Sequence, residues 1–357
     1  MRPEPLLLPN NQFDHFYLGG DRIRALRGGP GGPQRPEEWI GSATTRFGQS
    51  RQGLSALPDG TLLRERVVAD PVAWLGPEHT HRYGGYGVEL LVKLIDAGQR
   101  LPVHLHPDRA FAREHLGLSH GKTEAWYVLD AEPGAVVGLG FREPMAPGQV
   151  AELIRDHDSA RLVESVHHLA VRPGDAVLVP SGTAHFIGAG VLVLELQEPT
   201  DLSILLEWEG LTVDGERDGH LGLGFDTALQ ALDLRAWTRD DLDACVRRAE
   251  PAVAAGVQAR AMQAVPGMVG VLPSGAEPYF RADQLAPAGG EIGVPAGFAV
   301  LLLVDGDATV GTTEAGAHQV RRGDALLIPW SAGDWTLEGD GVGLLARPPA
   351  PDAPEGR

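Results

Sequence analysis

The feature that most constrains the fold of this chain is an internal repeat. The segment Pro173-Gly-Asp-Ala-Val-Leu-Val-Pro180 recurs almost residue for residue as Arg322-Gly-Asp-Ala-Leu-Leu-Ile-Pro329. Each copy is typical of a glycine turn followed by a short apolar strand that ends at proline. Self-similarity of this kind indicates two copies of one structural unit. We therefore expect two β-barrels in a single chain.

Side chains that bind metal ions occur in three short stretches of the first half. These are Val103-His-Leu-His106, Thr123-Glu124 and Pro180-Ser-Gly-Thr-Ala-His185. His104 and His106 stand two apart on a predicted strand, so their side chains share one face. With Glu124 and His185 they supply three imidazoles and one carboxylate, a complete ligand set for one divalent first-row metal ion. Three β-segments that meet at one ion describe the mouth of a small barrel.

These stretches resemble the two motifs of the cupin superfamily, and the sequence between them is similar to the type I mannose-6-phosphate isomerases. The interval between His106 and Glu124 is long, and this family inserts a short helix there, which we expect at Asp108 to Leu116. The resemblance covers roughly residues 10 to 235 well. The blocks that carry it are Leu90-Leu-Val-Lys-Leu-Ile-Asp96, Val103-His-Leu-His-Pro-Asp108, Gly121-Lys-Thr-Glu-Ala-Trp-Tyr127, Val179-Pro-Ser-Gly-Thr-Ala-His185 and Leu192-Val-Leu-Glu-Leu-Gln197.

The resemblance implies a ligand set and a metal. His106, Glu124 and His185 occupy the metal positions of the family, and His104 stands where the family has glutamine. One divalent ion is expected, zinc first, with iron or manganese as alternatives. The implied reaction is aldose–ketose isomerisation of a hexose phosphate, of the mannose 6-phosphate to fructose 6-phosphate type, or of a related sugar, through an enediol.

Two further residues are implied to be catalytic and to bind substrate. Lys122 occupies the position of a substrate-facing lysine, and Asp201 that of an acid four residues before the family's catalytic arginine. Here that arginine is replaced by Leu205, and the stretch Ile204-Leu-Leu-Glu-Trp-Glu-Gly210 is apolar and acidic. We therefore expect phosphate to contribute less to recognition than in the family. Basic side chains on other loops that are able to compensate are Lys122, Arg109 and Arg142.

Two other functions stay open on the sequence. A redox cupin of the dioxygenase kind is favoured by the 3-His-1-Glu set that His104 creates and by the missing arginine. The Gly121-Lys-Thr-Glu124 block and the inserted helix oppose it. A catalytically inactive sugar-binding cupin that keeps the ion for structure is the third possibility. Stoichiometric zinc favours the isomerase, and iron with oxygen uptake favours the redox enzyme.

The expected fold is dominated by β-structure, with two cupin (jelly-roll) barrels and a short helical segment between or beside them. The second barrel lacks the ligand set, because Trp330-Ser-Ala-Gly-Asp-Trp335 follows its repeat without a histidine. We expect it to bind no metal. The expected domains are residues 1–210 (metal-binding barrel with an irregular N-terminal extension), 211–262 (helical linker), 263–347 (degenerate barrel) and 348–357 (disordered tail).

Composition excludes several classes of partner and site. A net charge of −18 argues against binding nucleic acid or an anionic membrane through bulk electrostatics. The single Cys245 excludes a disulfide framework and a cysteine-based zinc site. The apolar run at the N-terminus, within Met1 to Pro9, is too short for a signal peptide, and no stretch reaches membrane-spanning length. We therefore expect a cytoplasmic protein whose partner is a small sugar or sugar phosphate; the sequence does not address its oligomeric state.

Overall fold

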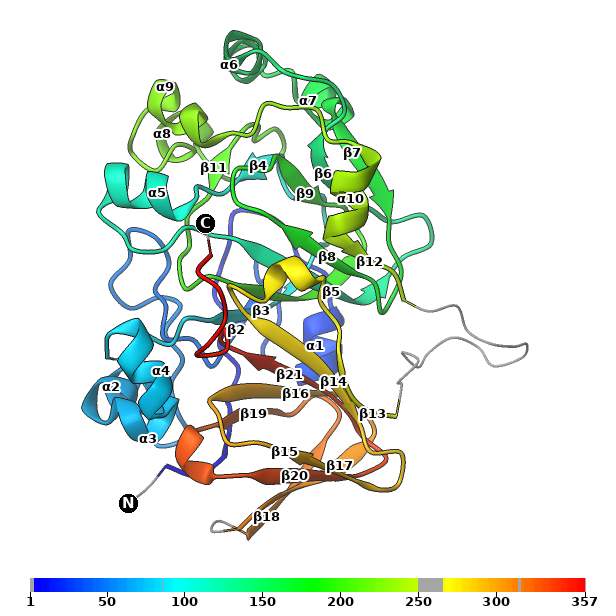
Figure 1. The fold of residues 1–357 in the computed structure, drawn as a ribbon. Coiled ribbons are helices and arrows are strands. Elements are labelled where there is room, and N and C mark those ends of the chain that lie inside the picture. The colour runs from blue at the N-terminus through cyan, green and yellow to red at the C-terminus, as the bar shows by residue number, and fades with distance from the viewer. Residues whose placement is uncertain (1–2, 86, 250–265, 314–315, 357) are drawn as a thin grey trace.

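The computed structural model describes residues 3–85, 87–249, 266–313 and 316–356. Two β-barrels lie against each other, and most of the helices surround the first barrel and the N-terminal part of the chain (Figure 1). Each barrel is a sandwich of two antiparallel sheets. The predicted strand-dominated fold with two barrels is confirmed.

The N-terminal barrel has a six-stranded sheet in the order β12-β8-β5-β10-β3-β2 and a five-stranded sheet in the order β11-β4-β9-β6-β7. The register brings the sequence motifs together, because His104 on β4 lies directly opposite His185 on β9. The strands are β2 (Glu37–Ile40), β3 (Leu91–Asp96), β4 (His104–Leu105), β5 (Glu124–Ala131), β6 (Val136–Phe141), β7 (Val166–Ala170), β8 (Ala176–Val179), β9 (His185–Ile187), β10 (Val191–Gln197), β11 (Ile204–Leu205) and β12 (Val246–Arg247).

The C-terminal barrel has a six-stranded sheet in the order β1-β19-β16-β21-β14-β13 and a four-stranded sheet in the order β15-β20-β17-β18. The two copies of the sequence repeat end in β8 and β19, one in each barrel. The strands are β1 (Leu6–Leu7), β13 (Gly267–Gly270), β14 (Arg281–Ala286), β15 (Glu291–Val294), β16 (Ala299–Asp305), β17 (Asp307–Thr312), β18 (Gly316–Arg321), β19 (Ala325–Ile328), β20 (Trp335–Gly339) and β21 (Val342–Arg347).

The two six-stranded sheets share one hydrophobic core. On β16, Leu301 and Leu303 belong to the core inside the C-terminal barrel. Val300 and Leu302 point the other way and join a core that also contains residues of β3, β5 and β10. Both faces of the strand are therefore buried, which explains why its sequence is an uninterrupted apolar run rather than an alternation.

Helices occupy the connections. The inserted helix expected between His106 and Glu124 is present as α5 followed by the π-helix η1. Four helices (α1 to α4) form within the extension expected to be irregular, and Pro71 and Pro77 begin two of them, as is common at the first helical position. The helices are α1 (Arg22–Arg27), α2 (Leu63–Ala69), α3 (Pro71–Leu75), α4 (Pro77–Tyr83), α5 (Arg109–Phe111), η1 (Ala112–Leu116), α6 (Pro147–Arg155), α7 (Ser159–Ser165), α8 (Gly215–Asp218), α9 (Phe225–Ala228), η2 (Leu229–Ala231), α10 (Arg239–Cys245), η3 (Ser274–Ala276) and η4 (Trp330–Ala332).

The segment between the barrels and the C-terminal tail complete the chain. Of the predicted helical linker, residues 250–262 lie outside the described residues. In the tail at residues 348–357, carbonyl groups accept hydrogen bonds from Arg82 and Arg281, the latter at 3.0 Å to Pro348. Because proline has no backbone N–H, the carbonyl groups of this proline-rich segment find few backbone donors nearby, and the two arginine side chains donate to them instead.

Within the described ranges, no helix combines the length and apolarity needed to cross a membrane.

A buried ion pair joins the N-terminal segment to both barrels. The Arg27 guanidinium lies 3.0 Å from Glu38 Oε1, and both side chains are almost fully buried. The same guanidinium donates to the carbonyl oxygens of Leu8, at 3.3 Å, and Gly323, at 2.5 Å. Glu38 belongs to β2 of the first barrel, whereas Gly323 precedes β19 of the second. Arg27 of helix α1 therefore contacts both barrels, Glu38 in the first and the Gly323 carbonyl in the second.

We predict that Arg27→Met lowers the free energy of unfolding by about 3–5 kcal/mol, because it leaves the Glu38 carboxylate buried without its cation. Arg24→Met, on the same helix but at an exposed arginine that lies 3.8 Å from Asp21, is the matched control and should change stability little. Adding Glu38→Gln to Arg27→Met should recover much of the loss. Urea unfolding measures all three, and equal stability of the Arg27 and Arg24 variants would contradict the assignment.

Candidate metal centre and active site

Three histidines from two paired strands meet at one point of the N-terminal barrel. The ligand nitrogens of His104, His106 and His185 all lie within 4.8 Å of one another, and the three side chains are buried. The ring centroids of His104 and His185 are 4.1 Å apart, as direct opposition across β4 and β9 requires. His106 follows two residues after His104 and presents its ring to the same side.

The hydrogen bonds of these imidazoles turn one nitrogen of each ring inward. The Nδ1 atoms of His104, His106 and His185 contact the backbone carbonyl oxygens of Pro102, Leu202 and Thr183 at 2.9, 2.6 and 2.8 Å. A carbonyl accepts only, so each Nδ1 carries the proton and each Nε2 keeps its lone pair. Carbonyl contacts of this kind orient histidines that bind metal ions.

Glu124 brings a carboxylate to the same point. Its Oε2 atom lies 3.0 Å from His106 Nε2, and its Oε1 atom lies 3.4 Å from His185 Nε2. Lys122 Nζ lies 2.9 Å from both Glu124 Oε2 and His106 Nε2. Despite these short distances, Glu124 Oε2 and His185 Nε2 are buried without a hydrogen bond of acceptable geometry among the described residues. Two buried lone-pair atoms that lack a well-formed hydrogen bond fit a site for a cation.

Electrostatics keep these groups in their metal-binding forms. Burial, together with the Lys122 ammonium, lowers the pKa of His106 to about 3, and burial holds the pKa of His104 well below its usual range. Burial alone would raise the pKa of Glu124, but Lys122 and His106 outweigh it and hold that pKa well below its usual value. Near neutral pH the site therefore offers the neutral imidazoles of His104 and His106 and a charged carboxylate, the forms that bind a divalent ion.

The centre opens into a cavity of about 660 Å³. The sequence-predicted residues Lys122 and Asp201 both line it, together with His104 and Glu124. Asp201 accepts a hydrogen bond from the backbone N–H of Phe47 at 3.2 Å. Four of the six predicted site residues thus line one cavity, and the other two, His106 and His185, contact Glu124.

Lys93 and Glu195 also line the cavity, and the sequence did not single them out. They lie directly opposite each other on β3 and β10, and Lys93 Nζ is 3.4 Å from Glu195 Oε1. The same ammonium lies 3.5 Å from Glu37 and 3.8 Å from Asp201. Only the strand register reveals this network, because nothing in the two separate segments indicates that they pair.

The basic side chains of the cavity differ from those expected to compensate for the missing arginine. Of the three candidates, Lys122 lines the cavity, whereas Arg109 is bound to Glu198 at 2.5 Å. Arg142 is not among the described lining residues. Arg46 and Arg217 stand in the cavity wall instead, on segments outside the motif-bearing strands.

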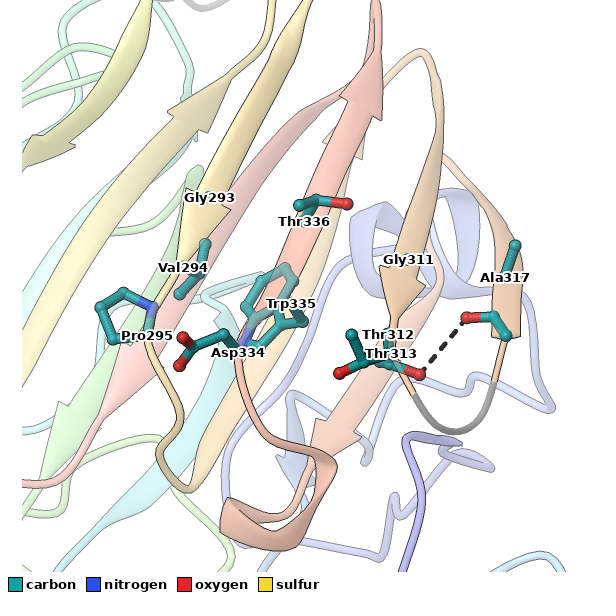
Figure 2. A pocket seen from close by; sticks show the side chains of 11 residues that line it. Gly293, Val294, Pro295, Gly311, Thr312, Thr313, Ala317, Asp334, Trp335 and Thr336 are labelled. Atoms are coloured by element: carbon teal, nitrogen blue, oxygen red, sulfur yellow. Dashed lines mark hydrogen bonds between the residues drawn. The ribbon is translucent and has the colours of Figure 1, made fainter.

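A second cavity, of about 700 Å³, lies in the C-terminal barrel at one end of the sheet β15-β20-β17-β18. Figure 2 shows that its wall consists mainly of glycine, threonine and apolar side chains. Asp334 is the ionisable side chain among the described lining residues, and its Oδ1 atom already accepts the Ala296 N–H at 2.9 Å. This cavity, although slightly larger, offers no chemistry comparable to that of the first.

Comparison with known proteins points to one family. No protein-family model matches the chain. A curated mannose-6-phosphate isomerase of Streptococcus mutans is 34% identical over 203 residues, which cover 56% of this chain and 58% of that protein. The chain thus spans less than two thirds of the length of this relative.

Solved structures extend the likeness to the whole fold. The mannose 6-phosphate isomerase of Bacillus subtilis has a TM-score of 0.68 at 22% identity and covers 97% of this chain and 100% of its own. A mannose 6-phosphate isomerase bound with zinc and yttrium has a TM-score of 0.69 at 15% identity, with coverage of 98% and 100%. The predicted resemblance to the mannose-6-phosphate isomerases is therefore confirmed, in sequence over about half of the chain and in fold over nearly all of it.

We predict that the purified protein carries one divalent ion per chain and that His185→Ala abolishes its retention, because the variant removes one of three converging imidazoles. His168→Ala is the matched control, since His168 lies on β7, at the edge of the same sheet, and its ring contacts the Val163 carbonyl instead. Elemental analysis after gel filtration measures both. Unchanged metal content in the His185 variant, or a second equivalent that persists in it, would contradict the assignment.

Proposed function

We propose that the protein is a metal-dependent aldose–ketose isomerase acting on mannose 6-phosphate or a closely related sugar. The observation that carries this proposal is that the three-histidine centre shares one cavity with Lys122, Asp201 and Glu195. A volume of about 660 Å³ lies within the range of small-molecule sites. The sequence and fold likeness to mannose-6-phosphate isomerases supports the same reaction.

We assign the ion to His104, His106, His185 and Glu124, with zinc as the first candidate because a structural neighbour binds it. A bound divalent ion supplies Lewis-acid stabilisation of the oxygen atoms that carry charge in the enediol. Lys122 lies against two of these ligands, so it also stands where it can hydrogen-bond a sugar oxygen beside the ion. His104 provides an imidazole where the resembled family has an amide.

Glu195 is our candidate for the group that moves the proton between the two carbons. Its side chain is buried in the cavity wall, held by Trp126 Nε1 at 3.2 Å and by Lys93. Burial and the nearby Glu124 carboxylate raise the pKa of Glu195 to about 7, against the opposing charge of Lys93. A base that works near neutral pH needs a pKa close to this value. Asp201 then serves to bind the sugar at the cavity wall.

We predict that kcat/KM for the isomerisation rises with pH up to about 7 and then levels. Below the pKa, Glu195 is protonated and cannot accept a proton from carbon, so activity falls by about tenfold per pH unit. Glu195→Gln should lower kcat by at least about a hundredfold. Glu209→Gln changes an exposed carboxylate outside the cavity and serves as the matched control. A rate that does not change across pH 7, or a Glu195 variant with normal kcat, would refute this role.

Two arginines of the cavity wall, Arg46 and Arg217, differ in how available their charge is for the phosphate of a sugar phosphate. The Arg217 guanidinium lies 2.6 Å from Asp218 and 3.9 Å from Asp214, so acids already balance its charge. Arg46 contacts neutral acceptors at long range, the Asp14 carbonyl at 3.4 Å and the Gln52 side chain at 3.5 Å. Its charge is therefore the more available for a phosphate. We propose Arg46 as the residue that takes over from the missing arginine.

We predict that Arg46→Met lowers kcat/KM for mannose 6-phosphate by about tenfold to a hundredfold, the worth of one charge-assisted contact. The value for unphosphorylated mannose should stay the same. Arg217→Met is the matched control and should have a smaller effect. Equal losses with both sugars would contradict the role of Arg46. A preference for the phosphorylated sugar above about ten-thousandfold in the unchanged protein, ~5.5 kcal/mol, would show that several cations bind the phosphate.

The reaction itself is tested with protein stripped of metal and reloaded with zinc or with iron. The zinc form should interconvert mannose 6-phosphate and fructose 6-phosphate, and in deuterated water it should place deuterium at C2 of recovered mannose 6-phosphate. The stripped protein should do neither. Oxygen uptake by the iron form without any isomerisation would instead favour the redox enzyme that the 3-His-1-Glu set leaves open.

A further inference from the structure

The segment that carries Lys122 and Glu124 has an anchor on the side away from the cavity. Thr123 lies between them, and its N–H donates to Glu198 Oε2 at 2.9 Å. The N–H of Glu198 donates in turn to the Thr123 carbonyl at 3.1 Å. Glu198 thus binds both the N–H and the carbonyl group of Thr123, and the two neighbours of Thr123 in the chain are the site residues Lys122 and Glu124. Any shift of Glu198 would move Lys122 and Glu124 relative to the three histidines.

The anchoring carboxylate depends on a cation from the inserted helix. Glu198 is 1% exposed, and its Oε1 atom accepts a hydrogen bond from Arg109 Nε at 2.5 Å. A buried carboxylate is stable only with such a partner. The helix of Arg109 begins directly after the His106 strand, and the Lys122 N–H donates to the Pro107 carbonyl at 3.0 Å. The pair is therefore built into the same loop system as the metal ligands.

The other side of Arg109 meets the C-terminal barrel. Its guanidinium carbon lies 5.2 Å from the ring centroid of Tyr279, within the range of a cation–π contact. Tyr279 stands between η3 and β14. Helix η3 is pressed against the N-terminal barrel, because a Cβ atom added at Gly275 would come within 2.8 Å of Leu178 on β8. The Tyr279 N–H donates to the Ala276 carbonyl of η3 at 2.9 Å, which ties the Tyr279 backbone to this packed turn.

We propose that Arg109 and Tyr279 are positioning residues, which act through Glu198 and the Thr123 backbone to set Lys122 and Glu124 against the three histidines. The C-terminal barrel, which carries no ligand set of its own, contributes to the metal centre in this way. The catalytic part of this inference rests on the proposed isomerase function. The metal-binding part does not.

A purely structural role makes a different prediction from a positioning role. A brace between the barrels would change thermal stability and leave the properties of the folded centre alone. A positioning residue changes metal affinity and kcat in protein that is fully folded. Partners of metal ligands typically change affinity by about tenfold or more when removed. The two roles are therefore separable by measurement.

The test uses Tyr279→Ala and Arg109→Met, each compared with a conservative variant. Zinc affinity is measured by competition with a chromophoric chelator, at a temperature where circular dichroism shows every variant folded, and kcat and KM are measured separately. We expect Tyr279→Ala and Arg109→Met to weaken zinc binding by about tenfold and to lower kcat, with KM little changed. Tyr279→Phe should restore both values, because it keeps the ring. Arg109→Lys should be intermediate, because an ammonium keeps the charge but not the planar stack.

Two controls guard against loss of folding. Arg109→Met combined with Glu198→Gln removes the buried charge and should fold, yet it should show the same weakened zinc binding. Arg235→Met removes a cation–π pair of similar geometry, 5.3 Å from the Trp237 ring, at an arginine whose ion pairs are with Asp233 and Asp241 rather than with Glu198, and should leave zinc binding unchanged. The proposal would be overturned if Tyr279→Ala had the same zinc affinity and the same kcat as the unchanged protein, whether or not its melting temperature were lower. Weakened zinc binding in a protein without isomerase activity would support the positioning role while refuting the proposed reaction.

Discussion

The metal centre depends on one short strand pairing. Strand β4 is two residues long, and its partnership with β9 is recorded at a single pair, His104 opposite His185. Neighbouring backbone bonds hold this pairing: the Gly182 N–H donates to the His106 carbonyl at 2.6 Å, and the Leu206 N–H donates to the Val103 carbonyl at 2.8 Å. A slip of β4 by one residue would turn His104 and His106 to the face opposite His185. The register is therefore the constraint on which the ligand set rests.

The barrel buries charges of both signs around this centre, and that arrangement favours function over stability. Lys93, Lys122, Glu37, Glu124 and Glu195 are all buried. Removing charged groups from water costs free energy that their mutual attraction repays only in good geometry. The two packed six-stranded sheets hold that geometry, since the shared apolar core supplies the stability that the polar cavity does not. The same burial sets the pKa of Glu195 near 7, where proton transfer at neutral pH needs it.

The sequence predicts what depends on local pattern and fails where long-range pairing decides. The repeat ending at Pro180 identified equivalent strands, and the His104-Leu-His106 spacing identified a shared face, because both follow from strand periodicity. The Lys93–Glu195 pair could not be predicted, since two strands distant in the chain meet only through the register of β10. Arg46 was missed for the same reason, because a loop before the motif region reaches the cavity. The helices of the N-terminal extension were also missed, although prolines at their first positions are a readable signal.

The central claim is that three strands of the N-terminal barrel build a single metal centre in which Glu124 joins three histidines. Anomalous diffraction at the zinc absorption edge, from crystals of the zinc-loaded protein, tests it most directly. The account predicts one anomalous peak per chain, within bonding distance of Nε2 of His104, His106 and His185 and of a Glu124 carboxylate oxygen. A peak elsewhere, a second peak in the C-terminal barrel, or zinc held by the histidines with Glu124 turned away would contradict it.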